Sequence, residues 1–358
     1  MARSPSSSSS NKYALPTIGG IFGRSDHDQF LISHQERQFD TFFPATLHEK
    51  MRKLYETGID ALAAILCERR NSHGSIRLWT PENFCRESLA RLKIKLEGPI
   101  EFVSYRNLDD FRELTSEDIV LYLHFNGYDS ASVKNIEAIK RKSGATVIED
   151  FVQAPLDISR FSGDFALNSL RKFSSVDVAV AYLQAGRQTS FDETRYRVLR
   201  KQAELVRSQF LANPTQDLEQ RFLKLGRESD AALVVPAISS AHPEEIERAM
   251  AFDFKTALSL RRCNYVRLAE NIRAEIPEIR ILPGDYMYLM IATEHRDRFR
   301  ADLFAERIFP VIHWADSGSV EVRSLLSLHV DQRYSSADMD RVSAAMQMTG
   351  NRLRRDVA

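Results

Sequence analysis

An acid, a serine and a lysine lie close together in the middle of the chain, each following a short apolar run. Asp150 ends the run that begins at residue 145, and Ser169 and Lys172 follow the run of residues 164–168. Short runs of Val, Ile, Ala and Phe between turn residues are typical of buried strands. Polar groups just past the ends of such strands form the ligand sites of open α/β sheets. We therefore expect Asp150, Ser169 and Lys172 at one edge of one sheet.

These three residue types are suited to binding pyridoxal 5'-phosphate. In such a site a lysine forms the Schiff base, an acid pairs with the pyridinium nitrogen, and hydroxyls together with a helix start bind the phosphate. Burial lowers the pKa of the lysine amine and so makes it nucleophilic. The spacing alone also allows a plainer interpretation, in which Asp150 caps a helix and Lys172 is a solvated surface charge.

Two segments of the chain resemble a known enzyme family. Residues 149–154, Glu-Asp-Phe-Val-Gln-Ala, are similar to the E-D-x-x-Q-A segment of the DegT/DnrJ-type sugar aminotransferases, which are fold-type-I enzymes dependent on pyridoxal phosphate. Residues 169–173, Ser-Leu-Arg-Lys-Phe, resemble the S-x-R-K segment that one branch of the family carries at its cofactor lysine. Further similar segments follow in the family's order along nearly the whole chain.

The resemblance assigns roles to the residues of this central stretch. It implies that Lys172 and Asp150 are the catalytic pair and that both bind the cofactor. Ser169, three residues before the lysine, would offer its hydroxyl to the phosphate. Gln153, three residues after the acid, would reach the phenolic oxygen of the cofactor.

A second cofactor segment is expected near residue 57. Thr57 and Gly58 precede an apolar helical pattern, and a helix N-terminus presents unpaired N–H groups to an anion. The family has S/T-G-x-x-A-L at this place, so the resemblance implies a phosphate loop of Gly58, Ile59 and Asp60. The alternative is that Thr57 is an ordinary N-cap. Phe84 lies where the family stacks an aromatic ring on the pyridine ring, with a core aromatic as the alternative.

Three features depart from the family's pattern. After the lysine the family usually carries a Gly-Gly pair, whereas this chain continues with Ser174 and Ser175 and has no glycine up to Ala181. The family also often supplies a phosphate-binding Asn from the partner subunit, and residues 188–226 contain no convincing match. In addition, Asn126 lies where an aromatic is usual. Because of these departures, a third hypothesis stays open: the protein is a non-catalytic relative that retains the fold for binding or assembly.

The C-terminal third carries the remaining similar segments. A helix is predicted from about Pro243 to Cys263, because proline is favoured in a first helical turn. Arg261 and Arg262 belong to a segment resembling the R-R-x-N-Y that begins the family's small domain, and we expect them to be structural or at an interface. Residues 308–314 and 326–334 also match the family, which implies His313 and Arg333 as candidate substrate contacts, with structural turns as the alternative.

The elements around these residues predict the fold class. Strands and helices alternate between residues 75 and 183, which implies right-handed crossovers and a mostly parallel sheet. The resemblance implies an α/β, fold-type-I transferase with a large mostly parallel-sheet domain and a smaller C-terminal α/β domain. We predict a disordered Ser-rich tail at residues 1–12, a large cofactor-binding domain at 13–238 and a small domain at 239–358.

Composition excludes several other classes of protein. The chain has 358 residues, 43% of them apolar, which is enough for more than one core. It has 49 Lys and Arg against 49 Asp and Glu, so a nucleic-acid binder with a broadly basic surface is not expected. The three cysteines are scattered, without metal-site spacing, and no apolar run is long enough to span a bilayer. We expect no metal, no membrane contact and a soluble, cytoplasmic protein.

The leading hypothesis is therefore a pyridoxal-phosphate-dependent aminotransferase. The resemblance implies that it transfers an amino group from an amino acid donor to a keto-sugar, expected to be nucleotide-linked, in amino-sugar, polysaccharide or secondary-metabolite biosynthesis, and that it is a homodimer. A second hypothesis keeps the cofactor but changes the reaction to elimination, dehydration or carbon–carbon chemistry. Lys172 argues against those dehydratases of the family in which histidine replaces the lysine.

Overall fold

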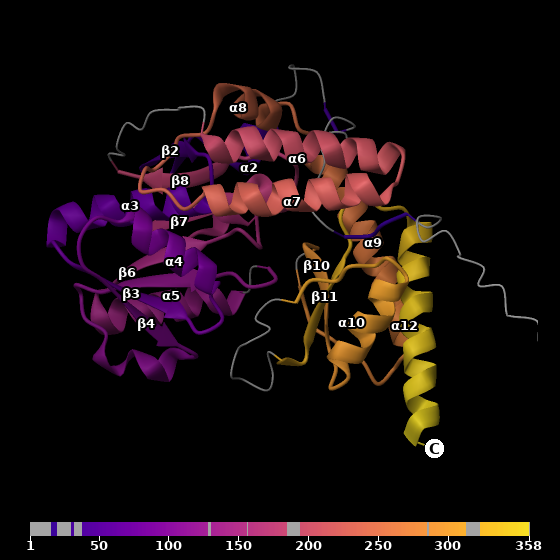
Figure 1. The fold of residues 1–358 in the computed structure, drawn as a ribbon. Helices are drawn as coiled ribbons and strands as arrows, with labels where there is room; N and C mark the ends of the chain where they lie inside the picture. The colour runs from indigo at the N-terminus through magenta and orange to yellow at the C-terminus, as the bar shows by residue number, and fades with distance from the viewer. Residues whose placement is uncertain are drawn as a thin grey trace, which may run out of the picture.

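A computed structural model describes residues 16–19, 30–31, 38–127, 130–155, 157–184, 194–284, 286–312 and 323–357. The predicted tail at residues 1–12 lies outside this part of the chain. The described residues form a large sheet with helices on its faces and a smaller C-terminal sheet with its own helices (Figure 1).

The larger sheet has eight strands in the order β1-β2-β8-β7-β6-β5-β3-β4. The neighbours from β4 to β7 pair in parallel, and β8, β2 and β1 are added in antiparallel pairings. This arrangement confirms the predicted α/β class with a mostly parallel sheet. The strands are β1 Thr46–Leu47, β2 Lys50–Tyr55, β3 Ile76–Pro81, β4 Ile100–Tyr105, β5 Ile119–Leu123, β6 Thr146–Asp150, β7 Phe165–Ser169 and β8 Ala179–Leu183.

The central strands β6, β7 and β8 are buried along their whole length. Continuous burial of this kind is expected where helices cover both faces of a sheet. The pairing places Asp150 beside Leu123 on β5 and Leu167 on β7, so the acid lies at the carboxyl edge of the parallel strands. The apolar runs therefore form the predicted strands, and their ends carry the predicted polar residues.

The helices around the larger sheet are α2 Phe39–Phe42, α3 Gly58–His73, α4 Arg86–Lys95, α5 Ser130–Ser143, α6 Arg195–Ala212, α7 Gln216–Ala232 and α8 Pro243–Met250. Short 3₁₀ helices are η1 Leu108–Glu113, η2 Ile158–Arg160 and η3 Leu170–Lys172. Residues 213–215 join α6 to α7, so the two helices form a hairpin. They lie side by side and extend from the larger sheet towards the C-terminal part (Figure 1).

The C-terminal part is built on a three-stranded antiparallel sheet in the order β11-β10-β9. Its elements are α9 Phe254–Glu275, β9 Arg280–Ile281, β10 Tyr288–Ala292, α10 Arg296–Ala305, β11 Leu325–His329 and α12 Ser336–Val357. The prediction of a single helix over 243–263 is wrong. The chain breaks after α8, and Asp253 begins α9 by accepting a 3.0 Å hydrogen bond from the Thr256 N–H.

Helix α9 belongs to two hydrophobic cores. Phe254 and Ala257 in its first turns pack in the core beneath the larger sheet, whereas Leu268 and Ile272 pack in the C-terminal core. The helix therefore contributes to both parts. The domain boundary at residue 238 stays a prediction, since Ala241 and other residues after it also pack beneath the larger sheet.

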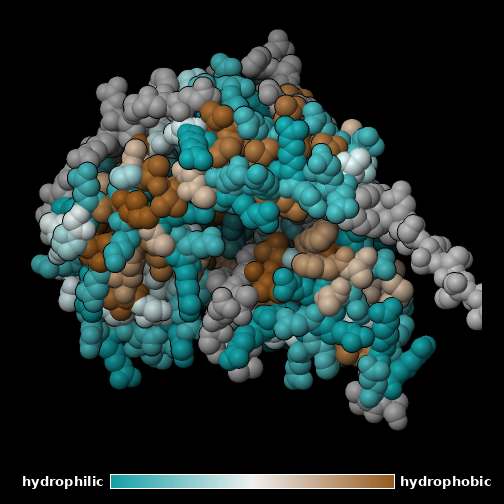
Figure 2. All heavy atoms as spheres, in the orientation of Figure 1, coloured by the Kyte–Doolittle hydropathy of each residue, from teal (hydrophilic) through white to brown (hydrophobic). Residues whose placement is uncertain are grey.

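Hydrophilic side chains cover most of the face seen in Figure 2, with hydrophobic patches over α6 and next to β10. Within the described part of the chain, no helix is both long and apolar enough to cross a membrane. Among the same residues, no group of three or more His, Cys, Asp and Glu side chains could hold a metal ion.

Candidate active site

A cavity of about 960 Å³ opens at the carboxyl edge of the larger sheet and is lined by residues from both parts of the molecule. The predicted site residues that line it are Gly58, Ile59, Phe84, Asp150, Gln153, Ser169, Lys172 and Arg333. Asp60 is absent from the lining, and His313 lies outside the described residues. Residues more than a hundred positions apart in the sequence thus share one cavity.

Asp150 is the last residue of β6, and only 6% of it is exposed. Its Oδ1 accepts a 2.8 Å hydrogen bond from the Val152 N–H. Burial raises the pKa of Asp150, while that hydrogen bond and the nearby charge of Lys172 oppose the rise. The site therefore holds a desolvated carboxylate that needs a cationic or N–H partner.

Lys172 ends the turn η3, which directly follows β7. The side chain is solvent-accessible within the cavity, yet protein surrounds it there. This desolvation lowers the pKa of Lys172, and the Asp150 carboxylate acts in the opposite direction. An amine with a lowered pKa is more often neutral, and the neutral form is the nucleophile.

Ser169 and the start of α3 form one corner of the cavity. Thr57 is the N-cap of α3, and its Oγ1 accepts a 3.2 Å hydrogen bond from the Asp60 N–H. A Cβ added to Gly58 would lie 3.5 Å from the Ser169 Cβ, so the two residues are in van der Waals range. The first N–H groups of a helix have no acceptor within the helix. This corner therefore combines a hydroxyl with N–H groups, as an anion site requires.

The proposed phosphate-loop role of Asp60 needs correction, because its side chain faces away from the cavity. The carboxylate is 1% exposed, pairs with Lys95 Nζ at 2.8 Å and accepts a 3.1 Å hydrogen bond from the Ser239 N–H. Its own N–H is bonded to Thr57 Oγ1. Asp60 thus fixes the start of α3, whereas Gly58, Ile59 and Ser169 line the cavity.

Gln153 is oriented by the end of β5. Its Oε1 accepts a 3.2 Å hydrogen bond from the Asn126 N–H, so the amide nitrogen is at the other end of the group. Asn126 has a positive φ of 58° and donates through Nδ2 to the Pro283 carbonyl at 3.0 Å. A Cβ on Gly284 would lie 2.3 Å from that nitrogen, so the contact requires glycine. Asn126 therefore joins the strand edge to the C-terminal part.

The loop after Lys172 needs no glycine. None of residues 173–178, all of which are described, has a positive φ. Glu245 accepts a 3.2 Å hydrogen bond from the Asp177 N–H, and Arg248 donates to Ser175 Oγ at 2.9 Å. Residues other than glycine are therefore compatible with the backbone here, where the chain lacks the family's Gly-Gly pair.

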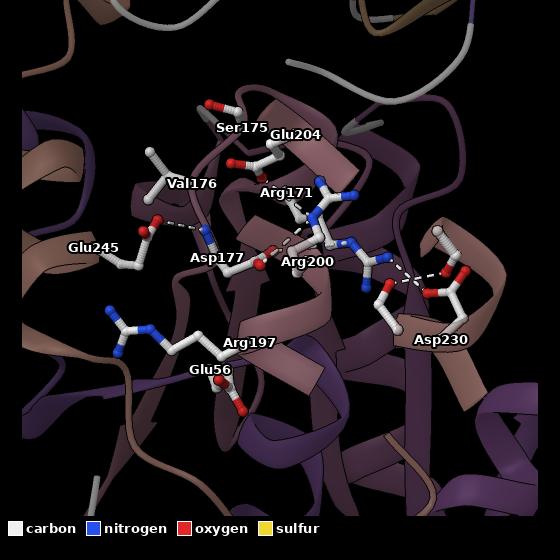
Figure 3. A network of polar contacts seen from close by, with 12 residues as sticks. Glu56, Arg171, Ser175, Val176, Asp177, Arg197, Arg200, Glu204, Asp230 and Glu245 are labelled. Carbon is white, nitrogen blue, oxygen red and sulfur yellow. Dashed lines mark hydrogen bonds and ion pairs between the residues drawn. The ribbon is translucent and has the colours of Figure 1, made fainter. Parts of the chain in front are cut away.

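Charged side chains around Asp177 fix the turn from the side of α6 (Figure 3). Arg171 pairs with Asp230 at 2.9 Å and lies 3.9 Å from Asp177. Arg200 of α6 lies 3.6 Å from Asp177 and 3.2 Å from Glu204. Arg171 and Arg200 also line the cavity, so this network reaches from the protein interior to the site.

Arg333 lines the cavity, but its guanidinium is held by a neighbour. Its Nε and Nη2 donate to the two oxygens of Asp331 at 2.8 and 2.9 Å. Burial raises the pKa of Asp331, and the charge and hydrogen bonds of Arg333 outweigh it and hold the pKa well below its usual range. Asp331 thus fixes the position of Arg333 in the cavity wall.

Comparison with known proteins was made by family, by sequence and by structure. No protein-family model matches this chain, and no curated protein matches it. Solved structures do match. DesI, solved in the presence of its TDP-sugar product, has a TM-score of 0.61 at 12% identity over 97% of both chains. The chain has the fold of a sugar aminotransferase.

Two further structures agree with this result. A DegT/DnrJ/EryC1/StrS aminotransferase from Brucella abortus has a TM-score of 0.53 at 16% identity, over 90% of this chain and 94% of that one. Spr1654 from Streptococcus pneumoniae, described as a sugar aminotransferase in its PLP form, has a TM-score of 0.59 at 10% identity, over 94% and 99% of the two chains. The predicted fold-type-I architecture is confirmed.

The aminotransferase fold also brings residues to the cavity that the sequence motifs did not indicate. Tyr288 of β10 and His329 of β11 line it from the C-terminal part, with His329 Nδ1 3.5 Å from an Asp331 oxygen. Arg200 and Arg261 reach it from α6 and α9. His329 could have been predicted from its position, because it lies in a segment already similar to the family. Arg200 had no such signal.

Proposed function

We propose that the protein is a pyridoxal-phosphate-dependent aminotransferase of the DegT/DnrJ type. The observation that carries this proposal is that Lys172 and Asp150 share one cavity with the anion corner of Gly58 and Ser169. An amine, a carboxylate and a phosphate-binding corner are the three groups that the cofactor's aldehyde, ring nitrogen and phosphate need. The residues present therefore fit the cofactor.

When bound, pyridoxal phosphate supplies an aldehyde carbon for amine exchange and a ring that accepts electrons from the substrate's Cα. Lys172 Nζ would hold the aldehyde carbon and, once an amino acid displaces it, would take the proton from the donor's Cα. The lowered pKa of Lys172 suits both tasks, because a base must be unprotonated at the working pH.

Five other residues would orient the group. Asp150 would accept a hydrogen bond from the ring nitrogen and favour its protonated form. Ser169 and the N–H groups of Gly58 and Ile59 would bind the phosphate, which the positive end of the α3 dipole attracts. The amide nitrogen of Gln153 would donate to the phenolic oxygen.

We propose a keto-sugar, nucleotide-linked, as the amino acceptor and an amino acid as the donor. The cavity of about 960 Å³ has room for a ligand of this size beside a cofactor. Its lining contains more Lys and Arg than Asp and Glu, among them Arg86 and Arg91 on α4, which favours a substrate carrying phosphates. The complex of DesI with a TDP-sugar points to the same class.

The assembly and location follow the resemblance. We propose a homodimer, and exposed apolar residues on the α6–α7 hairpin, Leu205 and Leu223, offer surface for a second copy. We also propose a cytoplasmic enzyme. Cys67, Cys85 and Cys263 are not joined in disulfides, which supports a reducing compartment.

The first half of the reaction can be tested without knowing the sugar. The purified protein loaded with pyridoxal phosphate is mixed with each common amino acid, and pyridoxamine phosphate is measured by mass spectrometry. We expect it to form with at least one amino acid. Cofactor bound at Lys172 but never converted would instead indicate elimination or carbon–carbon chemistry, and no binding would favour a non-catalytic relative.

A further inference from the structure

The turn that carries Lys172 is held from the C-terminal part by two buried side chains. Arg261 Nη2 of α9 lies 3.4 Å from the carbonyl oxygens of both Lys172 and Phe173. Gln332, just beyond β11, donates from Nε2 to the same Phe173 carbonyl at 2.7 Å. Both carbonyls of the turn therefore have donors that lie far away in the sequence.

The two side chains also bind each other. Arg261 Nε donates to Gln332 Oε1 at 2.6 Å, so both ends of the Gln332 amide are used. The guanidinium lies 4.3 Å from the centre of the Phe173 ring, within the range of a cation–π contact. Such a closed network specifies one arrangement of its members more sharply than separate contacts do.

The burial of Arg261 is costly. The residue is 1% exposed, and the partners named above are neutral oxygens, with Met287 Sδ 3.6 Å away as a further neutral contact. Burial lowers the pKa of Arg261 to about 10. Among the described residues no carboxylate forms a direct ion pair with Arg261, although the charge of Asp331 acts on it, and a charge buried in this way stabilises a fold poorly. A role beyond packing would account for the charge.

We propose that Arg261, with Gln332, is the positioning residue of the Lys172 turn and sets where the lysine amine lies relative to Asp150. The catalytic meaning of this positioning rests on the proposed aminotransferase function, whereas the positioning itself is a property of the polypeptide. Because α9 and residue 332 belong to the C-terminal part, that part then controls the placement of the lysine.

The test measures Lys172 directly in the full-length protein without cofactor. An amine-reactive reagent is applied across a pH series, and the labelling rate of Lys172 is read by peptide mass spectrometry, with the exposed Lys53 as internal reference. The variants are Arg261→Met and Gln332→Met. Arg262→Met is the matched control, because this exposed neighbour contacts only the Tyr286 ring among the contacts described here.

We expect both variants to move the midpoint of Lys172 labelling upward by about one pH unit, a tenfold change in proton affinity, because a released turn lets the amine move away from the protein groups that surround and desolvate it in the cavity. Asp150, Cys85 and Arg171 are the groups whose charges act on the amine, and these variants leave all three in place. The Lys53 midpoint should not change in any variant, and the Lys172 midpoint should not change in Arg262→Met. Affinity for pyridoxal phosphate should fall about tenfold in parallel.

An unchanged Lys172 midpoint in folded Arg261→Met would overturn the proposal and leave Arg261 as a packing residue. If Arg261→Met does not fold, Gln332→Met decides alone: methionine removes the donor to the Phe173 carbonyl without adding a charge, so the same upward shift is expected. A wild-type protein that binds no pyridoxal phosphate would contradict the proposed function, while the labelling comparison would still decide the role of Arg261.

Discussion

Gly58 lies against Ser169, with the position of a Gly58 Cβ only 3.5 Å from the Ser169 Cβ. One residue begins helix α3 and the other ends strand β7, so segments more than a hundred residues apart meet at one corner of the cavity. The contact puts a hydroxyl beside unpaired helix N–H groups. The affinity for the cofactor's phosphate should therefore depend on this corner.

Replacing Ser169 with alanine should weaken the binding of pyridoxal phosphate about tenfold, because one hydrogen bond to a charged group is lost. The binding of pyridoxal, which lacks the phosphate, should change little. Fluorescence titration with each compound measures both affinities. Equal losses for the two ligands would show that Ser169 does not act on the phosphate.

The Asp150→Asn variant should lower kcat/KM at least about a hundredfold, because the amide keeps the shape of the side chain but removes the charge that the ring nitrogen needs. Asp157→Asn serves as the control and should keep wild-type turnover, because Asp157 pairs with Arg160 at 3.2 Å and is absent from the cavity lining. Steady-state kinetics with saturating cofactor make the comparison. A fully active Asp150→Asn protein would remove Asp150 from the catalytic pair.

Removing one partner of the buried Asp60–Lys95 pair should destabilise the protein more than removing both partners. Lys95→Met leaves a buried carboxylate without its cation and should reduce the free energy of unfolding by about 3–5 kcal/mol. The double variant Asp60→Asn/Lys95→Met should recover part of that loss. Urea unfolding of the two variants and of Asp60→Asn completes the cycle. Additive losses would mean that the two groups do not interact.

Glu56 should make stability fall as pH rises. Burial, and then the charge of Asp60, raise the pKa of Glu56 to about 7, above its usual value of 4.5. The folded state therefore holds a proton that the unfolded state has lost between pH 4.5 and 7, so the free energy of unfolding decreases across that window and stays lower above it.

Glu56→Gln should remove this dependence. Relative to wild type, the variant should gain about 1–3 kcal/mol of stability between pH 5 and pH 8. The exposed Glu117→Gln is the control and should follow wild type at each pH. Melting curves across the series give the comparison. A difference between Glu56→Gln and wild type that stays constant with pH would contradict the assignment.

The parts of the site that the sequence predicts are those set by local pattern. Asp150, Ser169 and Lys172 end up at one sheet edge because apolar runs of strand length precede them, and strand length and burial are visible in the sequence. The start of α3 is likewise local, since Thr57 caps it directly. The pattern could not show which side chains of this turn line the cavity: Asp60 belongs to it, yet its carboxylate is buried against Lys95 and is absent from the lining.

Contacts between distant segments could not be predicted from the sequence. Arg261 reaches the Lys172 carbonyl across 89 positions, and Asn126 meets Pro283 across 157, so nothing local marks either pair. The missing Gly-Gly pair is a related case. Whether the chain can do without glycine after Lys172 depends on backbone angles, and none of residues 173–181 has a φ in the left-handed region.

The most direct test of the central claim is the position of the covalent link to the cofactor. The protein is incubated with pyridoxal phosphate, reduced with borohydride, digested and examined by peptide mass spectrometry, with Lys172→Ala treated in parallel. We predict one pyridoxyl adduct, on Lys172, and none in the variant. No adduct at all, or an adduct that persists on another lysine in Lys172→Ala, would contradict the account.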